Sequence, residues 1–220
     1  MALQRLTHDG YGQIELNQVA FRRDGRIEAQ CKLDEAQFTK EYPCENGMLL
    51  AVDNVTRTIH LPIASVAESG TEGQEGYVAP VAGYDTFPIA LHYSTEHIYD
   101  ERTPGLKNFA LYPQYRPQYY GFESYVYPRL GYLAVGDKFT SNCVCYDDGE
   151  FAATGAKSSE EVFLEALADV ANTPLYGGIS DIGAIKVSAT APEVGPVLAV
   201  RWADTMPDGQ NAVGFICVKD

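Results

Sequence analysis

The first third of the chain alternates between apolar and polar residues in the manner of β-strands. Two strand-like runs, residues 13–21 and 26–33, flank an Arg-Asp-Gly-Arg sequence that is typical of a hairpin turn. In the second run apolar residues alternate with charged or amide residues, so we expect one buried and one solvated face. A second pair of runs, residues 47–52 and 57–63, is joined by a short polar turn. The pattern therefore predicts an N-terminal β-hairpin region over residues 1–66.

The regular pattern breaks up over residues 67–131, which we expect to be extended and rich in loops. Residues 69–76 are rich in Gly and Glu and show no apolar period. Residues 109–132, here called the Tyr/Pro segment, hold seven of the fifteen tyrosines, with prolines at positions 113, 117 and 128. Proline fixes φ and removes a backbone donor, so neither a long helix nor a central strand can cross this segment. It is expected to be extended, partly polyproline-like, and to display amphipathic rings.

A β pattern returns over residues 132–220, interrupted by one predicted helix at residues 158–172. Ser158 and Glu161 have the spacing of a capping box, and apolar residues follow at helical period. Three strand-like runs complete the chain, at residues 184–190, 197–203 and 212–218. The fold class predicted for the whole chain is mainly β: a barrel or sandwich with one α-helix, plus the N-terminal hairpin region and the Tyr/Pro segment.

The charge balance narrows the classes of partner. Thirty acidic residues against sixteen basic ones give a formal net charge of −14 and a pI near 4.6. Nucleic-acid binding needs a basic face, so direct contact with nucleic acid is not expected, nor is contact with an anionic membrane. No apolar run approaches the length of a membrane helix, and the N-terminus does not resemble a signal peptide. The five cysteines show no zinc or CxxC spacing, which favours free thiols made in a reducing compartment.

Candidate chemistry is sparse. The densest group of metal-competent side chains is His92 and His97 with Glu96, Asp100 and Glu101. The spacing of the two histidines fits no familiar zinc motif, so a strand end followed by a polar loop explains it better. The sequence contains no nucleophile-elbow motif and no phosphate-binding glycine loop. We therefore expect no catalytic residue, no metal ligand and no cofactor.

Two features predict contacts with another surface. The basic trio Arg22, Arg23 and Arg26 suits recognition of carboxylates, although a solvated hairpin tip also explains it. The Tyr/Pro segment is near neutral in charge, whereas the rest of the chain is acidic. It is therefore the part of the surface that another copy of this acidic chain repels least. Two alternatives remain: its rings cover their own domain, or they stack on sugars. The predicted contact residues are Arg22, Arg23, Arg26, Tyr112, Tyr115, Arg116, Tyr119, Tyr120, Tyr125, Tyr127 and Arg129.

Four stretches carry a resemblance to a known group of proteins: GYGQIELNQVAFRRDGRIEAQCKLD, ENGMLLAVD, YPRLGYLAVGDKFTSNCVCYDD and TMPDGQNAVGFICV. Over about half of the chain they resemble structural proteins from the head-gene region of tailed bacteriophages of Gram-positive hosts. The resemblance implies a non-enzymatic virion protein, bound to the outside of the capsid as a decoration or cement protein. Its implied partners are the major capsid protein and copies of itself, for example in a trimer. It would assemble in the bacterial host cytoplasm and reside on the virion surface.

Two other classes of function remain open. A head-fibre or adhesin-type module would bind carbohydrate or a host surface through its tyrosines. A hydrolase with a spatially assembled site would place His92, Glu96 and His97 together.

Overall fold

The structure is a computed structural model of the 220-residue chain. Six predicted contact residues (Tyr112, Tyr115, Arg116, Tyr119, Tyr120 and Tyr125) and the loop at 69–76 lie outside the described residues. Backbone alone is described for residues 97–100 and 105–108. With both side chains and backbone, the structure describes residues 3–8, 11–39, 42–63, 83–94, 127–206 and 209–220.

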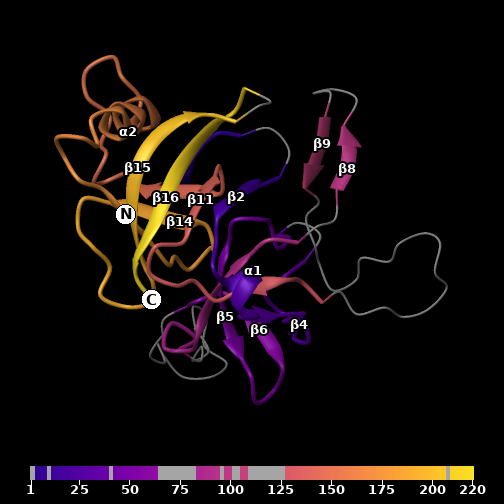
Figure 1. Cartoon of the computed structure of the whole chain (residues 1–220). Coiled ribbons are helices and arrows are strands. Elements are labelled where there is room, and N and C mark those ends of the chain that lie inside the picture. The colour runs from indigo at the N-terminus through magenta and orange to yellow at the C-terminus, as the bar shows by residue number, and fades with distance from the viewer. Residues whose placement is uncertain are drawn as a thin grey trace, which may run out of the picture.

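Two β-sheets dominate the described part of the chain (Figure 1). The larger is eight-stranded, in the order β1 (Leu3–Arg5), β12 (Val144–Asp147), β14 (Ile185–Ser188), β13 (Tyr176–Gly178), β15 (Val197–Thr205), β16 (Asn211–Lys219), β11 (Lys138–Ser141) and β2 (Ile14–Gln18). The smaller is six-stranded, in the order β3 (Ile27–Glu28), β10 (Leu130–Gly131), β7 (Ile89–His92), β5 (Leu49–Asp53), β6 (Thr58–His60) and β4 (Lys32–Leu33). The predicted mainly β class is confirmed in its sandwich-like form, and neither described sheet closes into a barrel.

The two sheets share their hydrophobic cores. One core cluster joins Leu49 and Leu91 of the smaller sheet to Phe139 and Phe215 of the larger sheet. A second cluster joins β5 and β6 to Cys143, Cys145 and Ala184. Strand β5 is buried along nearly its whole length because its alternate side chains enter different clusters. Cys143 and Cys145 lie in one cluster, as their two-residue spacing on a strand predicts.

Helix α2 (Ser159–Ala168) begins where the sequence predicts and ends earlier. The Ser158 side chain accepts from the Glu161 backbone, and the Glu161 carboxylate accepts from the Ser158 backbone at 2.7 Å, which is the predicted capping box. The helix buries Phe163, which stacks on Tyr146 with ring centroids 4.4 Å apart. The predicted end at residue 172 is wrong. After the helix, the Asp169 carboxylate accepts a hydrogen bond from the side-chain amide of Asn172 at 2.7 Å, and the chain closes into a turn.

The first predicted hairpin is wrong. Strands β2 and β3 do not pair: β2 pairs with β11 and β3 pairs with β10. Between them the chain forms the one-turn helix α1 (Phe21–Asp24), capped by Gly25 in the left-handed conformation at φ 70°. The side chain of Phe21 is fully buried and its ring lies 5.0 Å from that of Tyr93, so core burial overrides the Asp-Gly turn signal.

The second predicted hairpin and the C-terminal strands are confirmed. Strands β5 and β6 pair antiparallel, and the Asp53 carboxylate accepts from the Val55 and Thr56 amides in the turn. Strands β15 and β16 form a long antiparallel pair, and β14 lies beside β13. Strands β1 and β2 come from the first eighteen residues yet lie at the two edges of the sheet that holds the C-terminal strands. Residues 1–66 therefore contribute strands to both sheets.

A third, two-stranded sheet is formed by β8 (His97–Asp100) and β9 (Gly105–Asn108). Within the described residues these strands pair with each other and with no other strand. Figure 1 shows this ribbon standing apart from both larger sheets, immediately before residues 109–126 in the chain. Among the described helices, neither has the length and apolar character needed to cross a membrane.

Candidate binding site between the two sheets

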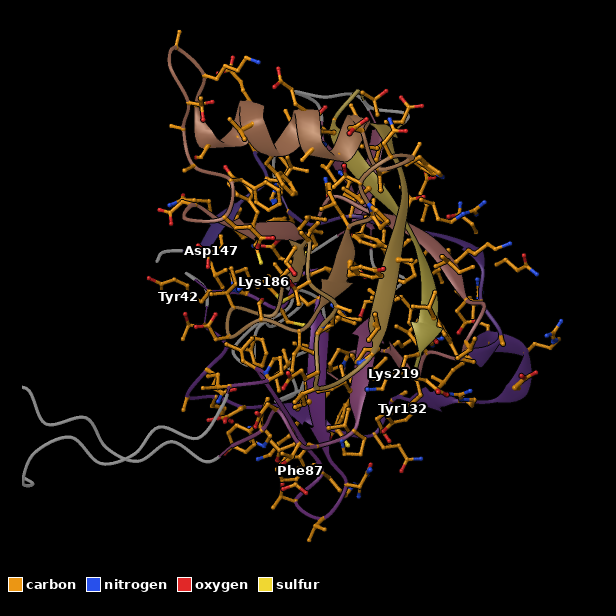
Figure 2. All side chains as sticks on the ribbon, turned by 90° about the vertical axis from the view of Figure 1, so that its left-hand side faces the viewer. Tyr42, Phe87, Tyr132, Asp147, Lys186 and Lys219 are labelled. Carbon is orange, nitrogen blue, oxygen red and sulfur yellow. The ribbon has the colours of Figure 1, made fainter. Side chains whose placement is uncertain are left out.

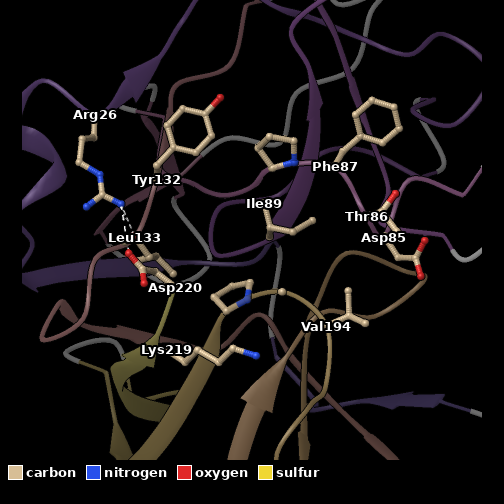
Figure 3. A pocket seen from close by; sticks show the side chains of 13 residues that line it. Arg26, Asp85, Thr86, Phe87, Ile89, Tyr132, Leu133, Val194, Lys219 and Asp220 are labelled. Carbon is tan, nitrogen blue, oxygen red and sulfur yellow. Dashed lines mark hydrogen bonds and ion pairs between the residues drawn. The ribbon is translucent and has the colours of Figure 1, made fainter.

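A pocket of about 590 Å³ lies where the ends of the two sheets meet (Figure 3). The smaller sheet supplies the residues before and within β7, including Phe87 and Ile89. The larger sheet supplies Lys219 at the end of β16 and the Val194–Pro196 stretch that leads into β15. Figure 2 places Phe87, Tyr132 and Lys219 along the same lower part of the molecule. The pocket therefore exists only when the two sheets are assembled.

The loop before β15 reaches the pocket because Gly195 permits it. Gly195 has φ 76°, in the region that side-chain-bearing residues rarely adopt. A Cβ at this position would lie 3.1 Å from the Ile179 side chain and 3.6 Å from that of Ile89. The backbone thus turns and approaches β7 closely at one residue, which brings Val194 and Pro196 to the pocket wall.

Phe87 is held in the pocket wall by a series of aromatic contacts. Its ring centroid lies 5.7 Å from that of Tyr84, which stacks on His60 at 3.9 Å with nearly parallel rings. The Nδ1 atom of His60 lies 2.8 Å from a carboxylate oxygen of Asp34. The Phe87 backbone N–H also donates to the Tyr84 carbonyl at 3.2 Å. These contacts help to fix the position of the ring.

Tyr132 supplies a second aromatic wall. Its backbone N–H donates to the Arg26 carbonyl at 3.0 Å, which ties it to the start of β3. Figure 3 shows the rings of Tyr132 and Phe87 on opposite sides of Ile89. Burial raises the pKa of the Tyr132 phenol, against a smaller opposing effect of a hydrogen bond with Asn54. The hydroxyl is therefore neutral at physiological pH.

Charged groups of both signs line the pocket in equal number: Arg26 and Lys219 against Asp85 and Asp220. The Arg26 guanidinium donates to the Leu133 carbonyl at 2.5 Å and lies 3.8 Å from the Asp220 carboxylate. The Lys219 ammonium donates to the Glu193 carbonyl at 3.4 Å. The formal charges of these four side chains cancel, whereas the chain as a whole carries a net charge of −14.

Of the predicted contact residues that are described, Arg26 is the one that lines this pocket. Arg22 and Arg23 are exposed on α1, and Arg23 lies 3.3 Å from its neighbour Asp24. Tyr127 and Arg129 are also exposed.

Arg22 and Arg129, distant in sequence, come close to one ring. Burial raises the pKa of Tyr93, while the positive charges of Arg129 and Arg22 oppose that rise. The Tyr93 backbone N–H donates to the Arg129 carbonyl at 3.0 Å. These two predicted contact residues thus share Tyr93 as an electrostatic neighbour, whereas Arg23 pairs with Asp24.

His92, the first of the metal-competent residues considered in the sequence analysis, is buried in the core. Its Nδ1 donates to the Glu45 carbonyl at 2.8 Å, and its Nε2 accepts from the Ser94 hydroxyl at 2.7 Å. Burial lowers its pKa to about 4, so the ring is neutral. His97 and Asp100 are described by backbone alone, while Glu96 and Glu101 lie outside the described residues. Among the described side chains, no three metal-competent groups gather.

The five cysteines are free and buried. Burial raises the pKa of Cys31 to about 11 and that of Cys145 to about 12, so both are protonated thiols. A thiol of this kind is a poor nucleophile.

A partly buried ion pair, which the sequence analysis did not predict, connects β1 to the turn before β5. Arg5 and Glu45 are joined at 2.8 Å, and the same carboxylate accepts from the Gly12 backbone at 2.7 Å. The pocket residues Phe87, Lys219, Asp85 and Asp220 were also missed. They lie in two separate stretches of the chain, and neither stretch has a motif. Among the pocket residues, Arg26 and Tyr132 belonged to segments with a recognisable signal, the basic trio and the Tyr/Pro segment.

Comparison with known proteins gave no relative: no protein-family model, no curated protein and no solved structure matches this chain.

Proposed function

We propose that the protein is a non-enzymatic structural component of a tailed-phage virion, bound to the outside of the capsid. Its partners are the major capsid protein and further copies of itself. The observation that carries the proposal is the ribbon β8–β9, which stands apart from both sheets (Figure 1). A two-stranded ribbon alone is marginally stable in water, so it gains stability when a partner surface covers it.

The position of the ribbon in the chain supports the same proposal. Strand β9 ends at Asn108, directly before the run of tyrosines and prolines at 109–126. Stiff, aromatic-rich segments lose little conformational entropy on binding and supply a large contact area. The acidic net charge suits the outer surface of a capsid better than the face that lines packaged DNA.

The hydrolase alternative gains no support from His92. Its ring is fully buried, and both ring nitrogens are engaged by Glu45 and Ser94. A substrate would have to displace these core contacts to reach it.

The test is removal of residues 109–126, replaced by a short Gly-Ser linker. Residues 130 and 131 must stay because they form β10, which pairs with β3 and β7. We expect the shortened protein to keep its circular dichroism spectrum and to lose at least about tenfold in affinity for capsids that lack it, measured by co-sedimentation.

Removal of the loop at 69–76 provides the matched control, since it also lies outside the described residues and lacks aromatic side chains. This control should bind capsids as the full chain does. If the 109–126 deletion bound equally well, residues 109–126 would have no part in attachment and the proposal would lose its contact surface.

A further inference from the structure

We propose that the pocket between the two sheets binds a neutral sugar unit. Its volume of about 590 Å³ lies within the usual range for small-ligand sites. The pocket contains none of residues 109–126, the proposed capsid contact, and the inference does not depend on that contact. It rests on three properties of the pocket. Aromatic rings form its walls, its acidic and basic side chains are equal in number, and contacts within the protein hold these groups in position.

The aromatic walls suit the apolar face of a sugar ring. The C–H groups on one face of a pyranose carry partial positive charge and are attracted to the negative face of an aromatic ring. Phe87 and Tyr132 are both partly exposed and line the pocket from two sides (Figure 3). Ile89 lies between them, and Pro88 adds to the apolar lining.

The charged groups suit hydroxyls better than an ion. Hydroxyl groups donate to carboxylates and accept from ammonium or guanidinium groups, and such charge-assisted hydrogen bonds are stronger than neutral ones. Within the described residues, Asp85 has no ion-pair or hydrogen-bond partner, so both of its oxygens are available. Lys219 and Arg26 provide donors, each already oriented by a backbone carbonyl.

The equal number of charges argues against an ionic ligand. A phosphate or carboxylate entering the pocket would meet Asp85 and Asp220, and a cation would meet Arg26 and Lys219. A neutral ligand with several hydroxyls satisfies both signs at once. A zwitterionic amino acid is the competing chemistry that the experiment has to separate.

The Phe87 side of the pocket, on which a sugar would stack, is preorganised. Phe87 is held by Tyr84, which is in turn held by His60, so the ring does not need to be ordered when the ligand arrives. Preorganisation of this kind lowers the entropic cost of binding.

The test uses saturation-transfer NMR on the full chain with glucose, galactose, mannose and N-acetylglucosamine, and with glycine and alanine as zwitterionic probes. At least one sugar should bind with a Kd on the order of 1 mM. Phe87→Ala should weaken binding about tenfold and Asp85→Asn about fivefold, because one removes the stacking face and the other an acceptor. Phe87→Tyr should keep most of the affinity.

Tyr42→Ala provides the control, since Tyr42 is 73% exposed and does not line this pocket. Asp85→Asn keeps the test valid if Phe87→Ala fails to fold, because Asp85 makes no hydrogen bond or ion pair within the described residues. Absence of sugar binding overturns the proposal. So does binding of the amino acids alone, or sugar binding that survives both pocket substitutions.

Discussion

His92 illustrates how a single side chain ties together three separate segments around the smaller sheet. It lies on β7, donates to the Glu45 carbonyl and accepts from Ser94, whose oxygen also accepts from the Arg129 backbone. The network fixes the neutral tautomer with its proton on Nδ1, because a carbonyl can only accept. A second proton on the ring would force the Ser94 hydroxyl to accept from Nε2 instead of donating to it, and would place a charge in the core.

This burial predicts a pH dependence of stability. The pKa of His92 is about 4 in the folded protein and about 6.5 when unfolded, so the unfolded state takes up the proton first. The free energy of unfolding should therefore fall as pH decreases from about 6.5 to about 4, by up to about 3 kcal/mol from this group.

Urea denaturation at several pH values, compared with His92→Asn, measures the effect. Asparagine retains a donor for Glu45 but does not titrate, so the slope in this window should be smaller in the variant. Equal slopes in the two proteins would mean that His92 is not the titrating group.

The close packing around Gly131 predicts that a single added methyl group destabilises the protein. A Cβ added there would lie 2.4 Å from the ring of Phe21, whose fully buried position α1 fixes. Gly131→Ala should lower the free energy of unfolding by about 2–3 kcal/mol, as overpacking does in other cores. Gly25→Ala is the comparison: its Cβ would meet open space, so only its φ of 70° opposes it, at about 1 kcal/mol. If chemical denaturation showed Gly131→Ala to be the milder change, Phe21 would not be fixed against β10.

At the scale of one element, α2 is the part most fully specified by local sequence. Its start depends on Ser158 and Glu161, which are three residues apart and need nothing else to recognise each other. Hydrogen bonds from Ser158 lower the pKa of the Glu161 carboxyl, in keeping with that reciprocal contact.

Ser158→Ala should therefore destabilise the protein by about 1 kcal/mol, measured by thermal or urea unfolding. Ser159→Ala is the matched control because Ser159 is the first helical residue and makes no capping bond. Equal losses from the two substitutions would show that the cap contributes little.

The two predicted hairpins show that local sequence predicts a turn but does not always predict which strands pair. Asp53 makes hydrogen bonds within its own turn, so the second hairpin follows from neighbouring residues. The Asp-Gly signal at residues 24 and 25 gives the αL cap of a helix instead, because Phe21 enters the core and β2 and β3 find partners more than a hundred residues away. Turn chemistry identified the turn correctly and the strand pairing incorrectly.

At the scale of the whole molecule, the larger sheet is completed by the N-terminus. Strand β1 pairs with β12 and β2 pairs with β11, and the Arg5–Glu45 ion pair ties β1 to the smaller sheet. Removing residues 1–18 exposes both β12 and β11 as new edges and leaves Glu45 without its cation.

A fragment of residues 132–220 should therefore fail to unfold cooperatively, whereas the full chain should show a single transition by circular dichroism. Fragment 132–220 contains β11 to β16 and α2 but lacks both edge partners. A sharp, native-like transition in the fragment would show that these residues form an independent domain.

The sequence alone determined the features that depend on neighbours in the chain: the mainly β class, the cap of α2, the β5–β6 turn and the shared face of Cys143 and Cys145. Each of these needs residues only a few positions apart. The tertiary structure alone decided the pairing of β1 and β2 with C-terminal strands, the burial of His92, and the pocket that joins Arg26, Phe87 and Lys219. Such features depend on which distant strands share a core, and alternation along one strand does not encode the identity of its partner.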